Sequence, residues 1–296
     1  MDSQYLFNGL NRKECGVMEW KVYDNPVAFS EKIEPLLYKN EDKYSLFLGI
    51  LGQINNGRYE EYYLALAEEG KEILAACLMT PPHPLQVIFF KEIFGLETDL
   101  ARHLKKELQE IPGVIGDKKV AEQFAEAWTA ETGTAVELHM DEGLYRIDAL
   151  APGLEKSRGS WRVANKRDAE LLEEWYLLFE KETGIGASSH KEASMKIEQF
   201  LDDKEVYVWE VEGETVSCMK KARPSKHGIT VSFVFTPEKY RRKGYARTMV
   251  AEVTEELLLE YDFVMLYTDL KNPTSNKMYS KIGYEKIANP VHLKFI

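Results

Sequence analysis

The chain has 296 residues, which is long for one core and suits two domains, because soluble domains usually hold roughly 100 to 200 residues. Hydrophobic residues make up 44% of the chain and charged residues 29%, a balance that excludes wholesale disorder. The formal net charge of -11 disfavours nucleic acid and anionic membranes as main partners, since an acidic surface repels polyanions.

The sequence also limits the compartment and the thiol chemistry. No apolar run approaches the roughly 20 residues that span a bilayer, and the N-terminus lacks a basic segment followed by an apolar one. We therefore expect a cytoplasmic protein. Cys15, Cys77 and Cys218 are widely spaced and odd in number, so neither a disulfide framework nor a paired metal-ligand motif is indicated.

The N-terminal half mixes helical and strand patterns. Two helical patterns come first, and two short apolar runs then flank the turn at 68–71, a hairpin signature. Pro81, Pro82 and Pro84 forbid continuation of a regular strand. The expected helices are 27–39, 41–53, 97–110 and 117–132, and the expected strands are 62–67, 73–79, 135–139 and 144–147.

A stretch rich in Pro, Gly and polar residues, ALAPGLEKSRGS at 149–160, separates two patterned regions. We place the linker there. The sequence thus predicts an N-terminal domain over 1–152 and a C-terminal domain over 160–296.

The C-terminal half gives a sharper series of elements. Helices are expected over 168–182, 192–202 and 273–282, with a long amphipathic helix after the basic residues near 243. Strands are expected over 161–164, 205–211, 215–222, 229–236 and 263–268. This order is typical of a mixed sheet flanked by helices.

A basic cluster stands between a predicted strand and a predicted helix. It comprises Lys239, Arg241, Arg242, Lys243 and Arg247. The first amides of a helix have no internal partner and form its positive end, so an anion docks there readily. Gly244 lets the backbone approach a phosphate, small Ala246 permits close packing, and the basic side chains suit a pyrophosphate.

A second segment follows the strand at 263–268. Asn272 is a good N-cap, Pro273 occupies a position that favours proline, and Gly283 is suited to end the helix. Helix capping alone could explain these three residues, and packing in the core could explain Tyr279, without a role in binding or catalysis.

Together the two segments resemble those of the GNAT superfamily of acyl-CoA-dependent N-acetyltransferases. Its pyrophosphate loop, [QR]-x-x-G-x-[GA], is matched by Arg241, Gly244 and Ala246, and its N-x(6)-Y-x(3)-G-[FY] segment by Asn272, Tyr279 and 283–284. The resemblance covers roughly 135 residues. It implies an α/β (α+β) fold of two GNAT-like domains, each a mixed, mostly antiparallel sheet flanked by helices.

The resemblance also implies roles for individual residues. Acetyl-CoA would be the acyl donor, with the pantetheine arm along the strand and the pyrophosphate on the loop. Asn272 or Asn276 would contact the pantetheine or fix the strand end, and Tyr279 would direct its hydroxyl to the thioester sulfur. The cofactor-binding candidates are Val234, Phe235, Thr236, Arg241, Arg242, Lys243, Gly244, Tyr245, Ala246, Arg247, Asn272 and Asn276.

The general base is left open. Many relatives carry a glutamate on one of two central strands, but here these read ITVSFVFT and FVMLYTD. Asp269, Glu210 through water, Ser232 and Tyr267 are candidates, as is solvent through a water chain.

The N-terminal half resembles a degenerate second GNAT-like domain, because it lacks both signatures. The cluster at 80–84 stands where the third strand should lead to a phosphate loop, and His83 is more typical of a loop residue than of a ligand. This half would shape the acceptor cleft or hold a dimer. Trp175, Phe179 and Glu180 suit a cationic amine, or are simply core and solvated residues.

These observations favour an acetyltransferase for a primary amine of a small-molecule acceptor, without a metal. A protein or peptide N-acetyltransferase and a non-catalytic acyl-CoA sensor are the competing interpretations. Whether the chain forms a homodimer is left open.

Overall fold

The computed structural model describes residues 18–108 and 110–296, so Cys15 and residue 109 lie outside the described residues. In the N-terminal half the elements are β1 (Met18–Val22), α1 (Pro26–Leu37), η1 (Tyr38–Asn40), α2 (Ser45–Asn55), β2 (Tyr63–Glu69), β3 (Glu72–Met79), β4 (Leu85–Phe89), α3 (Leu96–Glu107), β5 (Gly113–Asp117), α4 (Lys118–Thr132) and β6 (Val136–Ile147).

The C-terminal half repeats this order. Its elements are β7 (Ser160–Val163), η2 (Lys166–Asp168), α5 (Ala169–Thr183), α6 (His190–Asp202), β8 (Val206–Val211), β9 (Glu214–Ala222), β10 (Gly228–Phe235), η3 (Glu238–Tyr240), α7 (Tyr245–Leu257), β11 (Phe263–Asp269), α8 (Pro273–Ile282), β12 (Glu285–Ala288) and β13 (Pro290–Phe295).

The predicted helices and hairpins are therefore present with boundaries shifted by a few residues. Three expectations need correction. The strands expected at 135–139 and 144–147 are one strand, β6, and the cluster at 80–84 is the turn between β3 and β4 rather than the approach to a loop before α3. Strands β1, β4, β5, β12 and β13 were not predicted, because most are five residues or shorter and show little periodicity.

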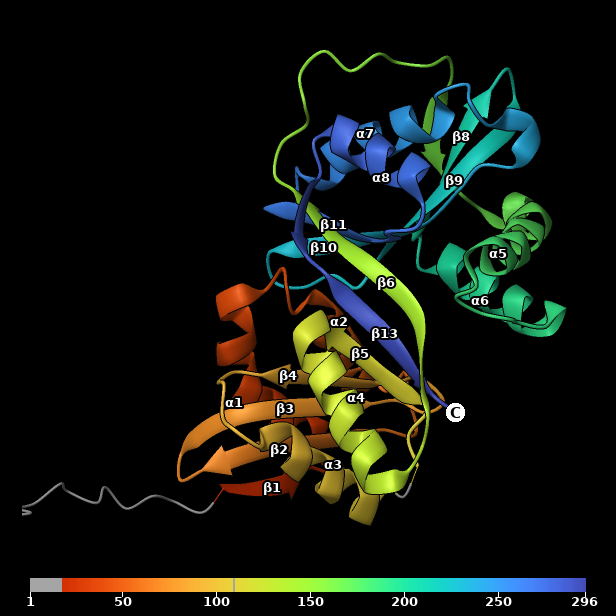
Figure 1. The fold of residues 1–296 in the computed structure, drawn as a ribbon. Helices are drawn as coiled ribbons and strands as arrows, with labels where there is room; N and C mark the ends of the chain where they lie inside the picture. The colour runs from red at the N-terminus through yellow and green to blue at the C-terminus, as the bar shows by residue number, and fades with distance from the viewer. Residues whose placement is uncertain (1–17, 109) are drawn as a thin grey trace, which may run out of the picture.

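The described strands form one continuous sheet, whose order is β1-β2-β3-β4-β5-β13-β6-β11-β10-β9-β8-β7, with β12 paired to β6. Its part from β1 to β13 is called the N-terminal sheet and its part from β11 to β7 the C-terminal sheet, and β6 is shared by both. Most neighbours are antiparallel. The parallel pairs are β4 with β5 and β10 with β11, one in each half. Figure 1 shows the two halves as an upper and a lower body joined by β6 and β13.

The two halves exchange strands. The first part of β6 pairs with β13 in the N-terminal sheet, and its second part, from Glu142 to Ile147, pairs with β11 in the C-terminal sheet. Strand β13, at the C-terminal end of the chain, lies between β5 and β6 of the N-terminal half. Each sheet is thus completed by a strand from the other half of the sequence.

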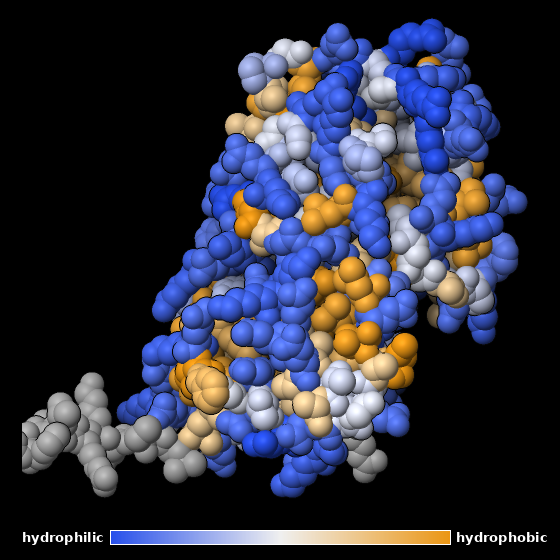
Figure 2. All heavy atoms as spheres, in the orientation of Figure 1, coloured by the Kyte–Doolittle hydropathy of each residue, from blue (hydrophilic) through white to orange (hydrophobic). Residues whose placement is uncertain are grey.

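Helices cover both faces of each half-sheet, and the apolar side chains between them form separate cores. Helices α1 and α2 cover one face of the N-terminal sheet, and α3 and α4 cover the other. In the C-terminal half α5 and α6 lie opposite α7 and α8. Figure 2 shows apolar side chains also gathered on the surface of the lower half, in the region of β5 and β6.

Residues 41–49, which lead into α2 and form its first turn, attach the N-terminal half to the C-terminal sheet. Buried Glu41 accepts a hydrogen bond from the backbone N–H of His227 at 2.8 Å, and its Oε2 lies 2.6 Å from the His227 Nδ1. Asp42 pairs with Arg146 at 2.8 Å, and the Ser45 and Tyr267 hydroxyls lie 3.1 Å apart.

None of the helices within residues 18–108 and 110–296 is both long and apolar enough to cross a bilayer. In the same part of the chain, no group of three or more His, Cys, Asp or Glu side chains is arranged to hold a metal ion.

The strand exchange predicts that the halves do not fold separately. Residues 160–296 expressed alone lose the β6 neighbour of β11, so we expect no cooperative thermal unfolding by circular dichroism. As a control, a protease site inserted at exposed Gly153, where nothing surrounds an added Cβ, should allow cleavage with the fold retained. Cooperative unfolding of the isolated 160–296 fragment would contradict the interdependence.

The Glu41 attachment predicts a pH-dependent contribution to stability. Burial raises the pKa of the Glu41 carboxyl, but hydrogen bonds from Ser225 and His227 outweigh it, so the pKa lies below its usual value. Its contribution is therefore present at neutral pH and is lost as the pH falls through the folded-state pKa. Glu41→Ala should lower the free energy of unfolding by about 1.5 to 3 kcal/mol, the usual value for a bond to a charged group.

Denaturant melts at several pH values test this expectation. The difference between wild type and Glu41→Ala should shrink below pH about 4, where free glutamate is protonated. Glu31→Ala, on an exposed position of α1, is the control. An equal difference at pH 3 and pH 7 would be inconsistent with a charged Glu41.

Candidate functional site

Strands β10 and β11 separate from each other towards their C-terminal ends. Their parallel pairing extends from Gly228↔Phe263 to Val231↔Leu266, although β10 continues to Phe235. A bulge between Ser232 and Phe235 shifts the register against β9, and Phe233 adopts a φ of 48°. The edge of β10 beyond Val231 is therefore not paired with β11.

The loop after β10 leads to a helix start with free amides. Arg242 has a φ of 64° and Gly244 a φ of 82°, and α7 begins without a side-chain cap. Among the described residues, no acceptor is found for the six backbone N–H groups from Arg242 to Arg247. An atom added at the Cβ position of Gly244 would meet nothing nearer than Ser157 at 3.7 Å. The turn is thus open, and it combines free donors with the positive end of a helix.

The basic side chains around this turn have different environments. Arg241 donates to the Thr236 carbonyl at 2.7 Å and to the Glu182 carboxylate at 2.6 and 2.8 Å, which attaches the loop to the end of α5. Arg247 donates to the Glu155 carbonyl at 3.1 Å, while its Nε is buried without a partner. Arg242 and Lys243 are exposed.

The predicted linker lies against the first turns of α7. The Ser157 N–H donates to the Thr248 Oγ1 at 2.9 Å, and the Ser157 hydroxyl donates to the same oxygen at 3.0 Å. Lys156 pairs with Glu252 at 3.0 Å. These contacts place the linker beside the candidate loop.

Tyr279, on α8, is 7% exposed and packs against Tyr284, with ring centroids 5.9 Å apart. Burial raises the pKa of the Tyr279 phenol, so the group is protonated at neutral pH. Its hydroxyl makes no hydrogen bond to the described part of the chain, whereas the Tyr284 hydroxyl lies 2.7 Å from the Thr254 Oγ1. Of the two phenols, Tyr279 is the one whose hydroxyl has no hydrogen-bond partner among the described residues.

The two asparagines have visible structural roles. Asn272 accepts the N–H of Ser275 at 3.1 Å and caps α8. Asn276 donates to the carbonyls of Asp269 and Leu270 at 3.2 and 3.3 Å, which fixes the end of β11, and its Oδ1 is buried without a partner. Val234 and Thr236 are half-buried on β10 and just beyond it, while Phe235 is 4% exposed in the core beneath α5.

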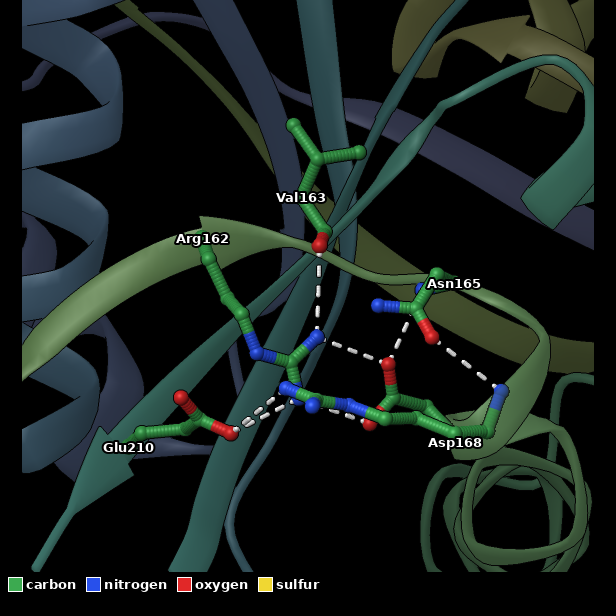
Figure 3. A network of polar contacts seen from close by, with 6 residues as sticks. Arg162, Val163, Asn165, Asp168 and Glu210 are labelled. Carbon is green, nitrogen blue, oxygen red and sulfur yellow. Dashed lines mark hydrogen bonds and ion pairs between the residues drawn. The ribbon is translucent and has the colours of Figure 1, made fainter. Parts of the chain in front are cut away.

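Glu210, one of the candidates for the general base, is held in an ion-pair network (Figure 3). Arg162 donates to Glu210 at 2.8 Å and to both oxygens of Asp168 at 2.7 and 2.8 Å, and Arg167 lies 3.4 Å from Glu210. The hydrogen bond from Arg162 lowers the pKa of Glu210. This carboxylate joins β7, β8 and η2, which makes it a poor proton acceptor.

Asp269, Tyr267 and Ser232, which could also serve as the base, are engaged in part. Asp269 accepts the N–H of Lys271 at 2.8 Å, and Tyr267 contacts Ser45 of α2. Burial raises the pKa of Tyr267, so its phenol stays protonated. Ser232 is half-buried next to the bulge.

Glu142 was not among the candidates from the sequence. It lies on β6 opposite Asp269, at the end where β10 and β11 have separated. Burial raises the pKa of Glu142 to about 7, with a further rise from Asp269 and an opposing effect of Arg223. The sequence patterns predicted no strand at Glu142. Because β6 belongs to the other half of the chain, no local pattern could indicate that Glu142 lies beside β11.

The residues predicted to border the acceptor are partly structural. Trp175 is 3% exposed and Phe179 packs against Phe233, so both belong to the core of this half. Glu180 is 4% exposed and accepts the N–H and hydroxyl of Ser188 at 2.7 and 2.9 Å, which fixes the connection from α5 to α6. His83 is exposed in the turn after β3.

The N-terminal half has an equivalent cleft with different chemistry. Pairing of β4 with β5 stops at Gln86↔Ile115, and Gly95, with a φ of 85°, precedes α3 as Gly244 precedes α7. A cavity of about 530 Å³ opens there, lined by strands β4 and β5, the start of α2 and Tyr267. The first turn of α3 carries Glu97 and Asp99, which oppose an anion.

Comparisons with known proteins agree with this geometry. Residues 203–293 match the model of the FR47-like protein family. A GCN5-related N-acetyltransferase from Sphaerobacter thermophilus aligns with a TM-score of 0.63 and 16% identity, over 93% of this chain and 95% of its own. A GNAT-family acetyltransferase from Colwellia psychrerythraea aligns with a TM-score of 0.57 and 13% identity, over 94% and 100%. No curated protein matches the chain.

A third structure aligns with both halves of the chain. A tandem GNAT protein from the clavulanic acid biosynthesis pathway aligns with a TM-score of 0.54 and 9% identity, over 94% of this chain and 98% of its own. The chain has a tandem GNAT fold. The likeness to these solved structures concerns the fold, which this chain shares with two acetyltransferases and with a tandem GNAT protein.

The two helix-start glycines of this tandem GNAT fold offer a matched test of the donor site. Gly244→Ala and Gly95→Ala each place a side chain at a left-handed φ, which costs roughly 1 to 2 kcal/mol of stability. Only Gly244→Ala should weaken acetyl-CoA binding, by at least about tenfold or 1.4 kcal/mol, measured by isothermal titration calorimetry. Weaker binding in Gly95→Ala alone would assign the donor to the N-terminal half instead.

Proposed function

We propose that the C-terminal half is an acetyl-CoA-dependent N-acetyltransferase acting on a primary amine. The observation that carries the proposal is the row of six free backbone amides at the start of α7, beside the open end of β10 and β11. Such a row suits a diphosphate, whose oxygens accept several hydrogen bonds at once.

The residues present fit coenzyme A along its length. The unpaired edge of β10 beyond Val231 would bind the pantetheine arm in the manner of an added strand. The diphosphate would lie on the amides 242–247, with the exposed Arg242 and Lys243 supplying positive charge beside it. The buried Nε of Arg247 and Oδ1 of Asn276 are polar atoms in this region without a protein partner.

The reaction is a direct attack of a neutral amine on the acetyl carbonyl carbon. A bond forms between nitrogen and carbon, the bond between carbon and sulfur breaks, and the amine loses a proton. A free alkyl amine with a pKa near 10 is mostly protonated at pH 7, so a group on the acceptor side must first remove the extra proton of the ammonium. The separated strands would hold both reactants in position, which contributes much of the acceleration in enzymes of this kind.

Tyr279 would donate the proton that the departing sulfur needs. The phenol is protonated at neutral pH and its hydroxyl is not used elsewhere in the described structure. Its neighbour Tyr284 donates to or accepts from Thr254 and supports the packing of α8 on α7. The two tyrosines therefore have the same side chain, similar burial and different proposed roles.

This difference gives a test that separates an enzyme from a sensor. Tyr279→Phe should lower kcat by about 100-fold or more, the usual contribution of a general acid, with acetyl-CoA affinity unchanged. Tyr284→Phe should lose stability but keep kcat. Release of free thiol is measured with a thiol-reactive dye against an amine panel. Unchanged turnover in Tyr279→Phe would remove this residue from the mechanism, and acetyl-CoA binding without turnover of any amine would favour a sensor.

A further inference from the structure

Arg223 lies between the two halves, without a hydrogen-bonded partner in the described part of the chain. It follows β9, is half-buried, and adopts a φ of 48°, an unfavourable backbone region for a residue with a Cβ. Its Nε is buried without a partner, and its guanidinium makes no hydrogen bond or ion pair with residues 18–108 or 110–296. An unpaired guanidinium inside a protein is costly, so a group that remains so calls for a ligand.

Helix α2 holds Arg223 in place. An atom added at the Cβ position of Gly49 would lie 2.6 Å from the Arg223 Cβ and 2.8 Å from its Cδ. The aliphatic part of Arg223 thus packs directly on the α2 backbone. Nearby Lys220 is neutralised by Glu205, with its Nζ 2.7 Å from the carboxylate, which leaves Arg223 as a cation without an ion pair in the described part of the chain.

Glu142 is an unpaired anion on the same face of the sheet. It is two residues from Leu144 on β6, so both side chains point to one face, and Leu144 packs with Met265 and Tyr267 on the face that α2 covers. Glu142 makes no hydrogen bond or ion pair within the described residues, and its charge interacts with those of Arg223 and Asp269.

The strand register places these two groups on either side of the expected acetyl position. Arg223 comes directly after Ala222, which pairs with Thr230 near the start of the paired part of β10 and β11. Glu142 pairs with Asp269, at the end where β10 and β11 have separated. The last paired residues, Val231 and Leu266, lie between these levels. Tyr267 comes next on β11 and contacts Ser45.

We propose that Arg223 and Glu142 form the acceptor site, and that the acceptor is an amine that also carries a carboxylate. A guanidinium matches a carboxylate in geometry and charge, and a carboxylate matches an ammonium. This inference rests on the proposed function of the C-terminal half and specifies its substrate class. It also gives the N-terminal half a role, since α2 positions the cation.

The chemistry balances without a further reagent. Arg223 binds the acceptor carboxylate, and Glu142 takes one proton from the acceptor ammonium. The freed nitrogen forms a bond to the acetyl carbon, the bond from that carbon to sulfur breaks, and the sulfur takes a proton from Tyr279. The nitrogen then releases its second proton to solvent, and the Tyr279 phenolate takes a proton back from solvent. The pKa of Glu142, about 7, suits a group that accepts a proton at neutral pH.

The test pairs each amino-carboxylate with its decarboxylated counterpart: glycine with methylamine, β-alanine with ethylamine, γ-aminobutyrate with propylamine and phenylalanine with phenethylamine. Thiol release is measured with acetyl-CoA on the full chain. For at least one pair, the carboxylate-bearing amine should have a kcat/KM at least 100-fold above its counterpart. Arg223→Met should remove that advantage, and Arg223→Lys should restore part of it.

A second pair of variants controls for misfolding. Gly49→Ala pushes on Arg223 and should raise the KM of the preferred amino-carboxylate at least tenfold. Gly52→Ala, on the same helix with nothing within 4 Å of the added Cβ, should leave it unchanged. Glu142→Gln should lower kcat at neutral pH while acetyl-CoA affinity stays the same.

The outcomes distinguish this inference from the proposed function. If wild-type protein binds acetyl-CoA but uses the decarboxylated amines equally well, or if Arg223→Met keeps the preference, the acceptor assignment is overturned. If wild-type protein fails to bind acetyl-CoA, the proposed function fails. Calorimetric titration of the four amino-carboxylates then tests the Arg223–Glu142 site directly, and absence of Arg223-dependent binding there overturns it as well.

Discussion

The structure depends on the way β6 is shared. One continuous strand pairs with β13 in the N-terminal sheet and with β11 in the C-terminal sheet, and β13 returns from the end of the chain to complete the first sheet. Backbone hydrogen bonds of each half therefore require residues of the other, since an unpaired strand edge leaves donors and acceptors without partners. This arrangement fixes the relative position of the halves and brings Glu142 next to β11.

The need of backbone N–H groups for hydrogen-bond partners also explains the candidate donor site. Helices α1, α6 and α8 begin with side-chain caps that accept their free amides, but α7 begins with Gly244 and no cap. The left-handed conformations of Arg242 and Gly244 open the turn further. In the N-terminal half the equivalent helix start keeps its glycine but carries two carboxylates in its first turn. The start of α7 therefore suits an anion, whereas the start of α3 opposes one.

Charge on the acceptor side is arranged differently. Most ionic groups near the site are paired within the protein: Arg162 with Asp168 and Glu210, Lys220 with Glu205. Arg223 and Glu142 are exceptions, and each lies where the two halves meet. Groups that a protein leaves unpaired in a partly buried setting carry a cost in stability, and such costs are typical of ligand sites. In the proposed acceptor site, the N-terminal half would contribute by packing α2 against Arg223.

The sequence by itself determined the local elements and the donor loop. Periodicity and capping residues gave the helices and the hairpins, and the spacing of Arg241, Gly244 and Tyr279 gave the GNAT resemblance, because those signals lie within short segments. Short strands such as β5 and β12, the single strand β6 and the return of β13 were decided by tertiary pairing. The juxtaposition of Gly49, Glu142 and Arg223 likewise depends on contacts between segments distant along the chain, for which one sequence carries no local pattern.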